Sequence, residues 1–173
     1  MASDRSKAYL YADGQRFMGK NTAEIFSEIA EQNLWMESES VSGFGSSLKQ
    51  TEELVAQLPG IFKKFGVKKL LDAPCGDFNW MKTVDLSGIE YTGGDIVQSI
   101  VDANNKAYRG SNIQFYRLDL LADPLGSHDL LFCRDCLVHL SFEDIFKMLG
   151  NLKRSSVRYL MTTTFPEENS NQD

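Results

Sequence analysis

The stretch Leu70–Trp80 constrains the fold of this chain more than any other. An apolar run that opens at Val67 leads into it, and the stretch turns abruptly polar at Asp72. Pro74 and Gly76 then favour a tight turn, and the aromatic residues that end the stretch could begin a helix. This pattern predicts a buried first strand of an α/β sheet. A carboxylate and a tight turn follow it, at the edge of the sheet where the strands end. Open α/β sheets bind their ligands at that edge.

Strands and helices alternate after this stretch. Predicted strands cover 67–72, 89–94, 113–118, 130–133 and 157–164, and predicted helices cover 79–84, 97–108 and 141–152. The alternation predicts an α/β fold with a doubly wound, Rossmann-like parallel sheet. Residues Ile100, Val101 and Ala107 are expected to face the core.

Two N-terminal helices are expected before the sheet, over 22–35 and from about 47 to 65. The second should break at Pro59, because proline lacks the backbone donor that a helix interior needs. A polar loop rich in serine and glycine, 37–47, joins them. The 173 residues predict one domain, with 1–65 as a helical cap or lid, 66–165 as the ligand-binding core and 166–173 as a polar tail.

Charge and cysteine content narrow the class of protein. The formal net charge is −6, and the basic residues occur as scattered pairs rather than a stripe, so no nucleic-acid partner is expected. The N-terminus is followed by no long apolar segment, which argues against secretion and membrane insertion. Three cysteines, an odd number, favour a reducing compartment and a cytoplasmic location.

Three successive predicted strands end in an aspartate: Asp72, Asp95 and Asp119. The carboxyl ends of neighbouring parallel strands meet at one crevice, so these side chains should converge. Asp95 follows Gly76 by 95 − 76 = 19 residues, close to the spacing at which an acid reaches a ribose diol. Asp119 could then accept a hydrogen bond from the exocyclic amine of an adenine. The arrangement therefore indicates a site for an adenosine with a free ribose.

Several short motifs then carry a resemblance. They are Leu71-Asp72-Ala73-Pro74-Cys75-Gly76-Asp77, Gly94-Asp95-Ile96, Leu118-Asp119-Leu120 and Cys133-Arg134-Asp135-Cys136-Leu137-Val138-His139-Leu140. In order and spacing, between about Phe65 and Phe165, they resemble class I S-adenosylmethionine-dependent methyltransferases. A narrower similarity, to a bacterial and viral branch of that superfamily, includes Trp35 and Ser42-Gly43-Phe44-Gly45-Ser46. Members of that branch often accompany genes for surface glycans, which suggests a sugar hydroxyl as acceptor.

The resemblance implies S-adenosylmethionine as cofactor, S-adenosylhomocysteine as product, a small polar acceptor and no metal. The implied cofactor-binding residues are Asp72, Ala73, Pro74, Cys75, Gly76, Asp77, Trp80, Asp95, Ile96, Asp119, Leu120 and Arg134. His139 and Asp135 are the implied catalytic residues. His139 is the candidate general base, because a hydroxyl acceptor must lose its proton and an imidazole ordinarily titrates near neutral pH.

Two departures from the superfamily pattern stand out. Pro74 and Phe78 replace the outer glycines of its first motif, so the loop should follow a locally different path. The predicted strands number five where this fold normally has seven, which suggests either a truncated chain or a reduced member.

Alternative interpretations stay open beside the methyltransferase. One is a non-catalytic S-adenosylmethionine-binding module or enzyme fragment. A nicotinamide-dependent dehydrogenase is less favoured, because the first motif lacks G-x-G-x-x-G and Asp77 would repel a pyrophosphate. Cys133 and Cys136 are interpreted as packing residues rather than a redox pair, because they straddle the end of the fourth strand and not the start of a first helix. With His139 they lack a fourth ligand for zinc. The acceptor and the oligomeric state are left open.

Overall fold

The computed structural model describes residues 16–165. Its centre is a five-stranded, all-parallel sheet with the order β3-β2-β1-β4-β5. The strands are β1 (Lys69–Asp72), β2 (Glu90–Asp95), β3 (Ile113–Arg117), β4 (Leu130–Cys133) and β5 (Tyr159–Thr162). The first strand is central, and the order reverses between β1 and β4. This confirms the predicted doubly wound, Rossmann-like sheet.

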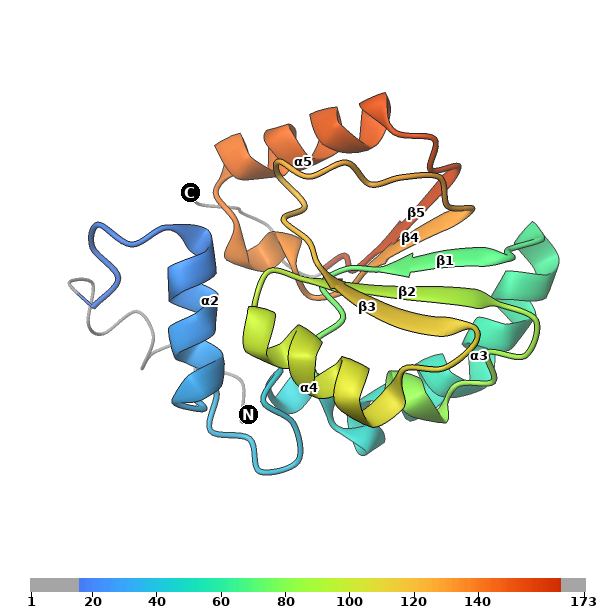
Figure 1. The fold of residues 1–173 in the computed structure, drawn as a ribbon, viewed down its shortest axis with the longest axis horizontal. Helices are drawn as coiled ribbons and strands as arrows, with labels where there is room; N and C mark the ends of the chain where they lie inside the picture. Colours follow the sequence, from blue (N-terminus) through green and yellow to red (C-terminus); the bar gives the residue numbers. More distant parts are fainter. Residues whose placement is uncertain (1–15, 166–173) are drawn as a thin grey trace.

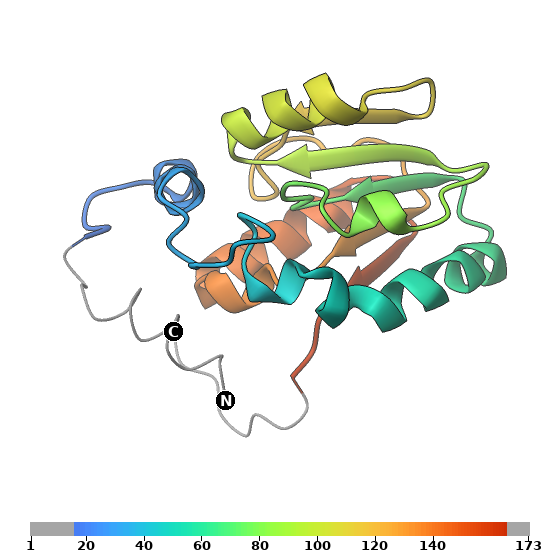
Figure 2. The same cartoon turned by 90° about the horizontal axis from the view of Figure 1, so that it is seen from below.

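Helices cover both faces of this sheet. They are α2 (Thr22–Glu31), α3 (Leu48–Phe65), α4 (Gln98–Tyr108) and α5 (Phe142–Arg154), with short 3-10 helices η1 (Phe44–Ser46), η2 (Met81–Thr83) and η3 (Leu137–His139). Figure 1 and Figure 2 show α3 and α4 on one face, α5 on the other, and α2 lying beyond the carboxyl ends of the strands. No helix in the described part of the chain is long and apolar enough to span a membrane.

Side chains of the central strands point alternately to the two faces of the sheet, and the core is therefore divided into two layers. Leu70 packs in the cluster under α3 and α4, together with Leu58 and Phe62 of α3. Leu71, the next residue, packs on the opposite face beside Met148 of α5. Successive side chains of a strand point to opposite faces, so two adjacent leucines supply both layers. This two-sided burial fixes β1 in the middle of the sheet.

Two expectations about helices were wrong. Helix α3 runs unbroken through Pro59 to Gly66, whose left-handed conformation ends it. Leu58 and Phe62 are buried on the same side before and after the proline, and their packing outweighs the one lost backbone bond. The helix expected over 79–84 is only the single turn η2.

Burial along α4 also differs from expectation. Val101 is buried as predicted and Ile100 is half-buried, but Ala107 is exposed. Asn104 occupies the inward position instead, one helical turn after Val101. From there its side-chain amide donates a hydrogen bond to the loop after β1.

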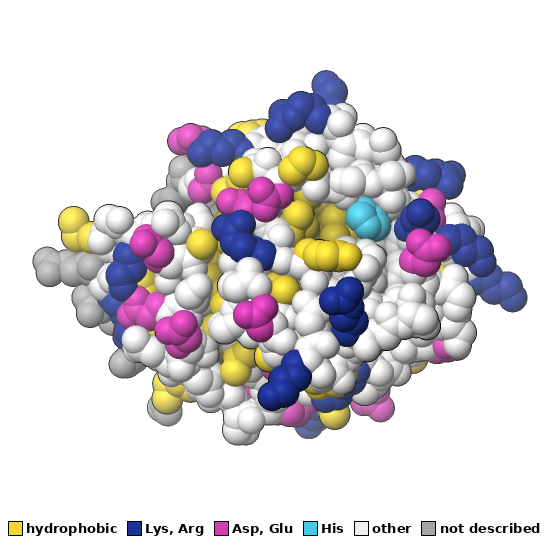
Figure 3. Space-filling model, viewed as in Figure 1, with side chains coloured by type: hydrophobic (Ala, Val, Ile, Leu, Met, Phe, Trp, Pro, Cys, Tyr) yellow, Lys and Arg dark blue, Asp and Glu magenta, His cyan; other side chains and the backbone are white. Residues whose placement is uncertain are grey.

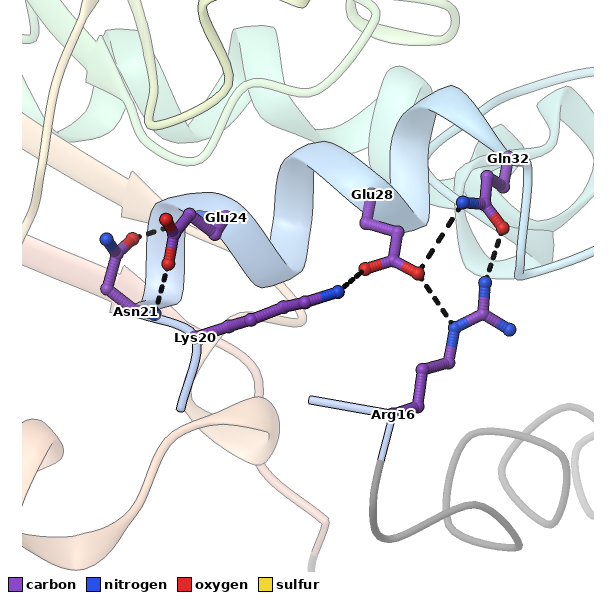
Figure 4. Close-up of polar contacts among 6 residues, drawn as sticks. All are labelled: Arg16, Lys20, Asn21, Glu24, Glu28 and Gln32. Carbon is purple, nitrogen blue, oxygen red and sulfur yellow. Dashed lines mark hydrogen bonds and ion pairs between the residues drawn. The ribbon is translucent and has the colours of Figure 1, made fainter. Parts of the chain in front are cut away.

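Helix α2 begins with a capping box but ends at Glu31, earlier than the predicted end near residue 35. Asn21 accepts the backbone N–H of Glu24 at 3.0 Å, and the Glu24 carboxylate accepts the backbone N–H of Asn21 at 2.8 Å. Glu28 then binds the side chains of Arg16 and Lys20, which precede the helix (Figure 4). These contacts fold the incoming chain back against α2. The predicted irregular arm before it lies mostly outside the described residues.

Charges of both signs are interspersed on the face of the molecule drawn in Figure 3. Lys and Arg side chains alternate there with Asp and Glu side chains and do not gather into a stripe. A basic stripe is the footprint expected of a surface that binds nucleic acid. This face has no such footprint.

Candidate functional site

A cavity of about 410 Å³ is lined by residues at the carboxyl ends of the strands and by residues of α2. Its size falls within the roughly 300–1,000 Å³ typical of small-molecule sites. Nearly every residue predicted for the site lines it: Asp72, Ala73, Pro74, Cys75, Gly76, Trp80, Asp95, Ile96, Asp119, Leu120, Arg134, Asp135 and His139. Asp77 is the exception. The three strand-end aspartates therefore line one cavity, as their predicted convergence requires.

Asp72 is a buried carboxylate at the end of β1. The hydroxyl of Tyr91 donates to its Oδ2 at 2.6 Å. Burial raises the pKa of Asp72 to about 7; the Tyr91 hydrogen bond and the charge of Arg134 lower it, and the charge of Asp95 raises it further. Burial disfavours the ionised form of Asp72, and a cationic ligand group placed beside the carboxylate would stabilise that form.

Asp95, at the end of β2, ties two loops together. Its Oδ2 accepts the backbone N–H of Gly76 at 3.0 Å, and its Oδ1 accepts that of Val97 at 3.0 Å. Burial raises the pKa of this carboxyl, and hydrogen bonds from the backbone of Val97, Gly76 and Ile96 lower it. Each carboxylate oxygen has two lone pairs, so both oxygens retain capacity for a ligand hydroxyl.

Asp119 follows β3 and turns the chain along the cavity wall. Its Oδ1 accepts the backbone N–H of Leu121 at 2.9 Å. Close packing of the glycines before Asp95 shapes the adjoining wall: a Cβ on Gly94 would meet Leu118 Cδ2 at 2.7 Å. The cavity thus presents carboxylates at three strand ends, with the apolar Ile96 and Leu120 beside them.

The loop after β1 accommodates Phe78, one of the two residues that replace the outer glycines of the superfamily's first motif. Phe78 has a positive φ of 59° and turns into the core, where its ring lies 5.0 Å from that of Tyr91 and 5.1 Å from that of Phe115. The ring is buried behind the loop, and the backbone at Phe78 adopts a left-handed conformation that glycine usually supplies. Asn104 supports the same loop by donating to the carbonyl of Gly76 at 2.8 Å.

The serine- and glycine-rich segment 37–47 packs directly on this loop. The Asp77 carboxylate accepts the Ser40 hydroxyl and the backbone N–H of Val41, each at 3.0 Å. The backbone N–H of Asp77 donates to Ser42 Oγ at 3.2 Å, and a Cβ on Gly76 would meet that oxygen at 2.1 Å. Asp77 therefore holds the wall of the cavity rather than lining it.

A second network fastens the end of the same segment. Asn79 Nδ2 donates to Glu39 Oε1 at 2.9 Å, and the backbone N–H of Leu48 donates to that oxygen at 2.7 Å. The guanidinium of Arg134 donates to the carbonyl of Gly45 at 3.0 Å from the far side of the cavity. Two distant parts of the chain, residues 77–79 and Arg134, thus fix this segment.

Arg134 is largely committed to protein contacts. Besides Gly45 it pairs with Asp135 Oδ2 at 3.0 Å, and its guanidinium lies 5.7 Å from the Trp80 ring centroid. Asp135 has a positive φ of 48°, and its backbone N–H donates to Thr163 Oγ1 at 2.9 Å. The two charges neutralise each other at the end of β4.

His139 lies in η3 at the rim of the cavity, in an aromatic cluster with α2. Its ring centroid is 5.8 Å from that of Trp35 and 6.3 Å from that of Phe26. Trp35 and Phe26 are themselves 6.4 Å apart. This candidate base is thus reachable from the cavity and held by residues about a hundred positions away.

The sequence interpretation missed three contributions to the site: Asn104, Phe26 and the carbonyl of Gly45. An asparagine on the inward face of α4 was a readable signal for the first. The other two depend on how the N-terminal segment meets the sheet edge, and no local pattern encodes that contact.

No protein-family model matches the chain, and no curated protein matches it. Solved structures do match. N-methyltransferase NodS from Bradyrhizobium japonicum WM9, in complex with S-adenosyl-L-homocysteine, aligns with a TM-score of 0.57 and 14% identity over 73% of this chain and 65% of that one. The DhpI–SAM–HEP complex aligns with a TM-score of 0.59 and 16% identity over 83% and 65%.

The methyltransferase domain of bacterial CtHen1 aligns with a TM-score of 0.55 and 16% identity over 67% of this chain and 65% of that domain. The chain thus spans slightly less than two thirds of the length of each of these structures. At such identities the likeness concerns the backbone arrangement. The chain has the fold of the class I S-adenosylmethionine-dependent methyltransferases.

Proposed function

We propose that this chain binds S-adenosylmethionine and transfers its methyl group to the hydroxyl of a small molecule. The observation that carries the proposal is the convergence of three strand-end carboxylates on one cavity in a methyltransferase fold. Carboxylates suit hydroxyls and ammonium groups as partners and repel phosphates. The same three carboxylates therefore disfavour a nicotinamide dinucleotide, because they repel its pyrophosphate.

Each strand end has a distinct role in this proposal. Asp72 faces the ammonium of the methionine portion, which compensates its burial, and the backbone of 73–77 wraps that portion. Asp95 accepts the ribose hydroxyls with the lone pairs left by Gly76 and Val97. Ile96 and Leu120 contact the two faces of the adenine, and Asp119 accepts a hydrogen bond from its exocyclic amine.

The reaction follows from positioning and proton removal. When bound, S-adenosylmethionine supplies a methyl carbon whose bond to sulfur breaks as the acceptor oxygen bonds to it, with sulfur keeping the electron pair. A ring nitrogen of His139 takes the hydroxyl proton and later releases it to solvent. Asp135, paired with Arg134, orients the acceptor beside them, while the segment 37–47 and α2 exclude water.

Several finer predictions belong to the same proposal. Residues 16–65 act as a cap over the core, the protein works in the cytoplasm, and the acceptor is a small molecule. Support for the cap comes from the contacts of segment 37–47 with Asp77 and Arg134. A sugar hydroxyl as acceptor rests only on the resemblance of the sequence motifs.

Calorimetric titration with S-adenosylhomocysteine, with NADH in a parallel cell, tests the cofactor. We expect saturable binding of S-adenosylhomocysteine alone. Asp95→Asn should weaken it by about 10- to 100-fold, because a hydrogen bond to a charged group contributes about 1.5–3 kcal/mol. Asp102→Asn, on the exposed side of α4, is the matched control and should bind normally.

Two results would contradict this assignment. Binding of NADH alone would make the protein a nucleotide-dependent oxidoreductase, and normal affinity in Asp95→Asn would remove the ribose role. Circular dichroism of each variant separates loss of binding from loss of folding. Binding of S-adenosylhomocysteine without turnover of any acceptor would instead indicate a non-catalytic binding module.

A further inference from the structure

The part of the cavity that faces α2 differs in chemistry from the part at the sheet edge. The three strand-end carboxylates lie at the sheet edge. The other part is lined by six large apolar or aromatic side chains from α2, the loop before α3 and the segments after β4 and β5: Phe26, Trp35, Phe44, Val138, Leu140 and Phe165. Phe44 and Phe165 are each half exposed, so this part opens to solvent. We call it the aromatic chamber.

Charge in the aromatic chamber is already compensated. Among the described residues that line the cavity, Arg134 is the sole lysine or arginine. It pairs with Asp135 at 3.0 Å and donates to the carbonyl of Gly45 at 3.0 Å. An anionic acceptor would have to break this pair, and a cationic acceptor would compete with Arg134 for Asp135. The chamber therefore favours an uncharged acceptor.

Polar groups are also few in the chamber. Among the described residues, Thr22, Ser42 and Ser46 are the hydroxyl side chains that line the cavity as a whole. Ser42 Oγ already accepts the backbone N–H of Asp77. A sugar carries a hydroxyl on most of its ring carbons, and each one buried without a partner costs free energy. A sugar is thus a poor match to the chamber.

The aromatic rings instead match a flat apolar ring. His139 and Trp35 lie 5.8 Å apart at an interplanar angle of 34°, and Phe26 meets the His139 ring nearly edge-on at 76°. Rings prefer offset-stacked or edge-to-face contacts at such separations. The three rings already contact one another, so a ligand ring would pack on the outer edge of this cluster, beside Trp35, and bring a hydroxyl substituent to His139.

From this arrangement we infer that the acceptor is an uncharged aryl hydroxyl, a phenol-class molecule, recognised by Trp35 and Phe26. The inference rests on the proposed function and names the substrate class of that same site. It makes Trp35 and Phe26 specificity-determining residues that act on acceptor binding. They have no assigned part in holding the cofactor.

Calorimetry in saturating S-adenosylhomocysteine tests this without any turnover. The probes are naphthol, methyl glucoside and naphthoate, which represent a neutral flat ring, a neutral sugar and an anionic flat ring. Naphthol should bind about 2- to 10-fold more tightly than either of the others, the scale of one aromatic contact. Trp35→Ala should weaken naphthol binding by about 10-fold and leave S-adenosylhomocysteine affinity within about 2-fold.

Further variants keep the test decisive. Trp35→Phe should recover most of the affinity for naphthol, and Phe26→Leu should lose it in part without emptying the core of α2. Phe146→Ala, which removes a ring that is 70% exposed and lies outside the cavity, is the matched control and should bind all ligands normally.

Each outcome has one meaning. Tighter binding of methyl glucoside or naphthoate, equal affinity in Trp35→Ala, or no binding of any probe beside bound S-adenosylhomocysteine overturns the aryl inference and leaves the proposed function standing. Failure of S-adenosylhomocysteine itself to bind overturns the proposed function and this inference with it.

Discussion

Asp72 shows how a single residue prepares this site at a cost in stability. Among the described residues, its hydrogen-bond donor is the neutral hydroxyl of Tyr91, at 2.6 Å. Burial raises the pKa of Asp72 to about 7. An acid whose pKa is raised in the folded state binds its proton more tightly there than in the unfolded chain. The folded protein therefore loses stability as the pH rises.

The pH window follows from the two pKa values. Asp72 ionises near pH 4 in the unfolded chain and near pH 7 in the folded one, so stability falls between these values and levels off above the second. Asp72→Asn keeps an oxygen for Tyr91 and removes the charge. Relative to the wild type it should gain up to roughly 4 kcal/mol above pH 8, and little near pH 4, in urea denaturation.

Asp85 provides a contrast of opposite sign. This exposed carboxylate accepts the backbone N–H of Ser87 at 3.0 Å, and hydrogen bonds with Ser87 lower the pKa of Asp85. Asp85→Asn should therefore lose stability at pH 7 relative to the wild type, where Asp72→Asn gains it. A stability gain in Asp72→Asn that stays constant from pH 4 to pH 8 would show that the charge is not its cause.

At the scale of elements, the segment 37–47, whose only helical turn is η1, shows how side-chain hydrogen bonds fix an irregular segment as a wall of the cavity. Asp77 accepts the Ser40 hydroxyl and the backbone N–H of Val41, each at 3.0 Å. Asp77→Ala removes both bonds and should speed hydrogen exchange of the Val41 amide by about 10- to 100-fold, since bonds to a charged group contribute about 1.5–3 kcal/mol. Exchange measured by mass spectrometry or NMR reports this directly.

The matched control for that variant is Asp85→Ala, which removes an exposed aspartate that also caps a turn. It should leave exchange in 37–47 unchanged. Equal protection of Val41 in Asp77→Ala and in the wild type would mean that Glu39 and Arg134 hold the segment without Asp77. The cap assignment would then depend on those two residues.

Elements with a strong local pattern could be predicted from the sequence, and their mutual contacts could not. Strand β4 (Leu130–Cys133) matches its prediction at both ends because its four apolar residues are all buried. The parallel order made the meeting of Asp72, Asp95 and Asp119 predictable. The unbroken α3 was missed because tertiary packing overrides the cost of Pro59. The contacts of Trp35 with His139 were missed because they join residues a hundred positions apart.

At the scale of the whole molecule, one sheet separates two cores and joins them through β1. Leu70 belongs to the core under α3 and α4, and Leu71 to the core under α5. The cavity opens at the edge where both layers meet the cap. Because every layer contributes to the cavity wall, a ligand there should stabilise the molecule as a unit rather than one helix or loop.

This coupling predicts a single, ligand-dependent thermal transition. S-adenosylhomocysteine at 100 times its dissociation constant should add about 2.7 kcal/mol to the free energy of unfolding. For a chain of this length that raises the Tm by roughly 5–10 °C, since each kcal/mol shifts it by about 2–4 °C. Scanning calorimetry measures both the shift and the number of transitions. Asp95→Asn at the same ligand concentration should shift less, because its affinity is lower. Two separate transitions, of which the ligand moves only one, would show that the cap and the core unfold independently and that the cavity belongs to one of them alone.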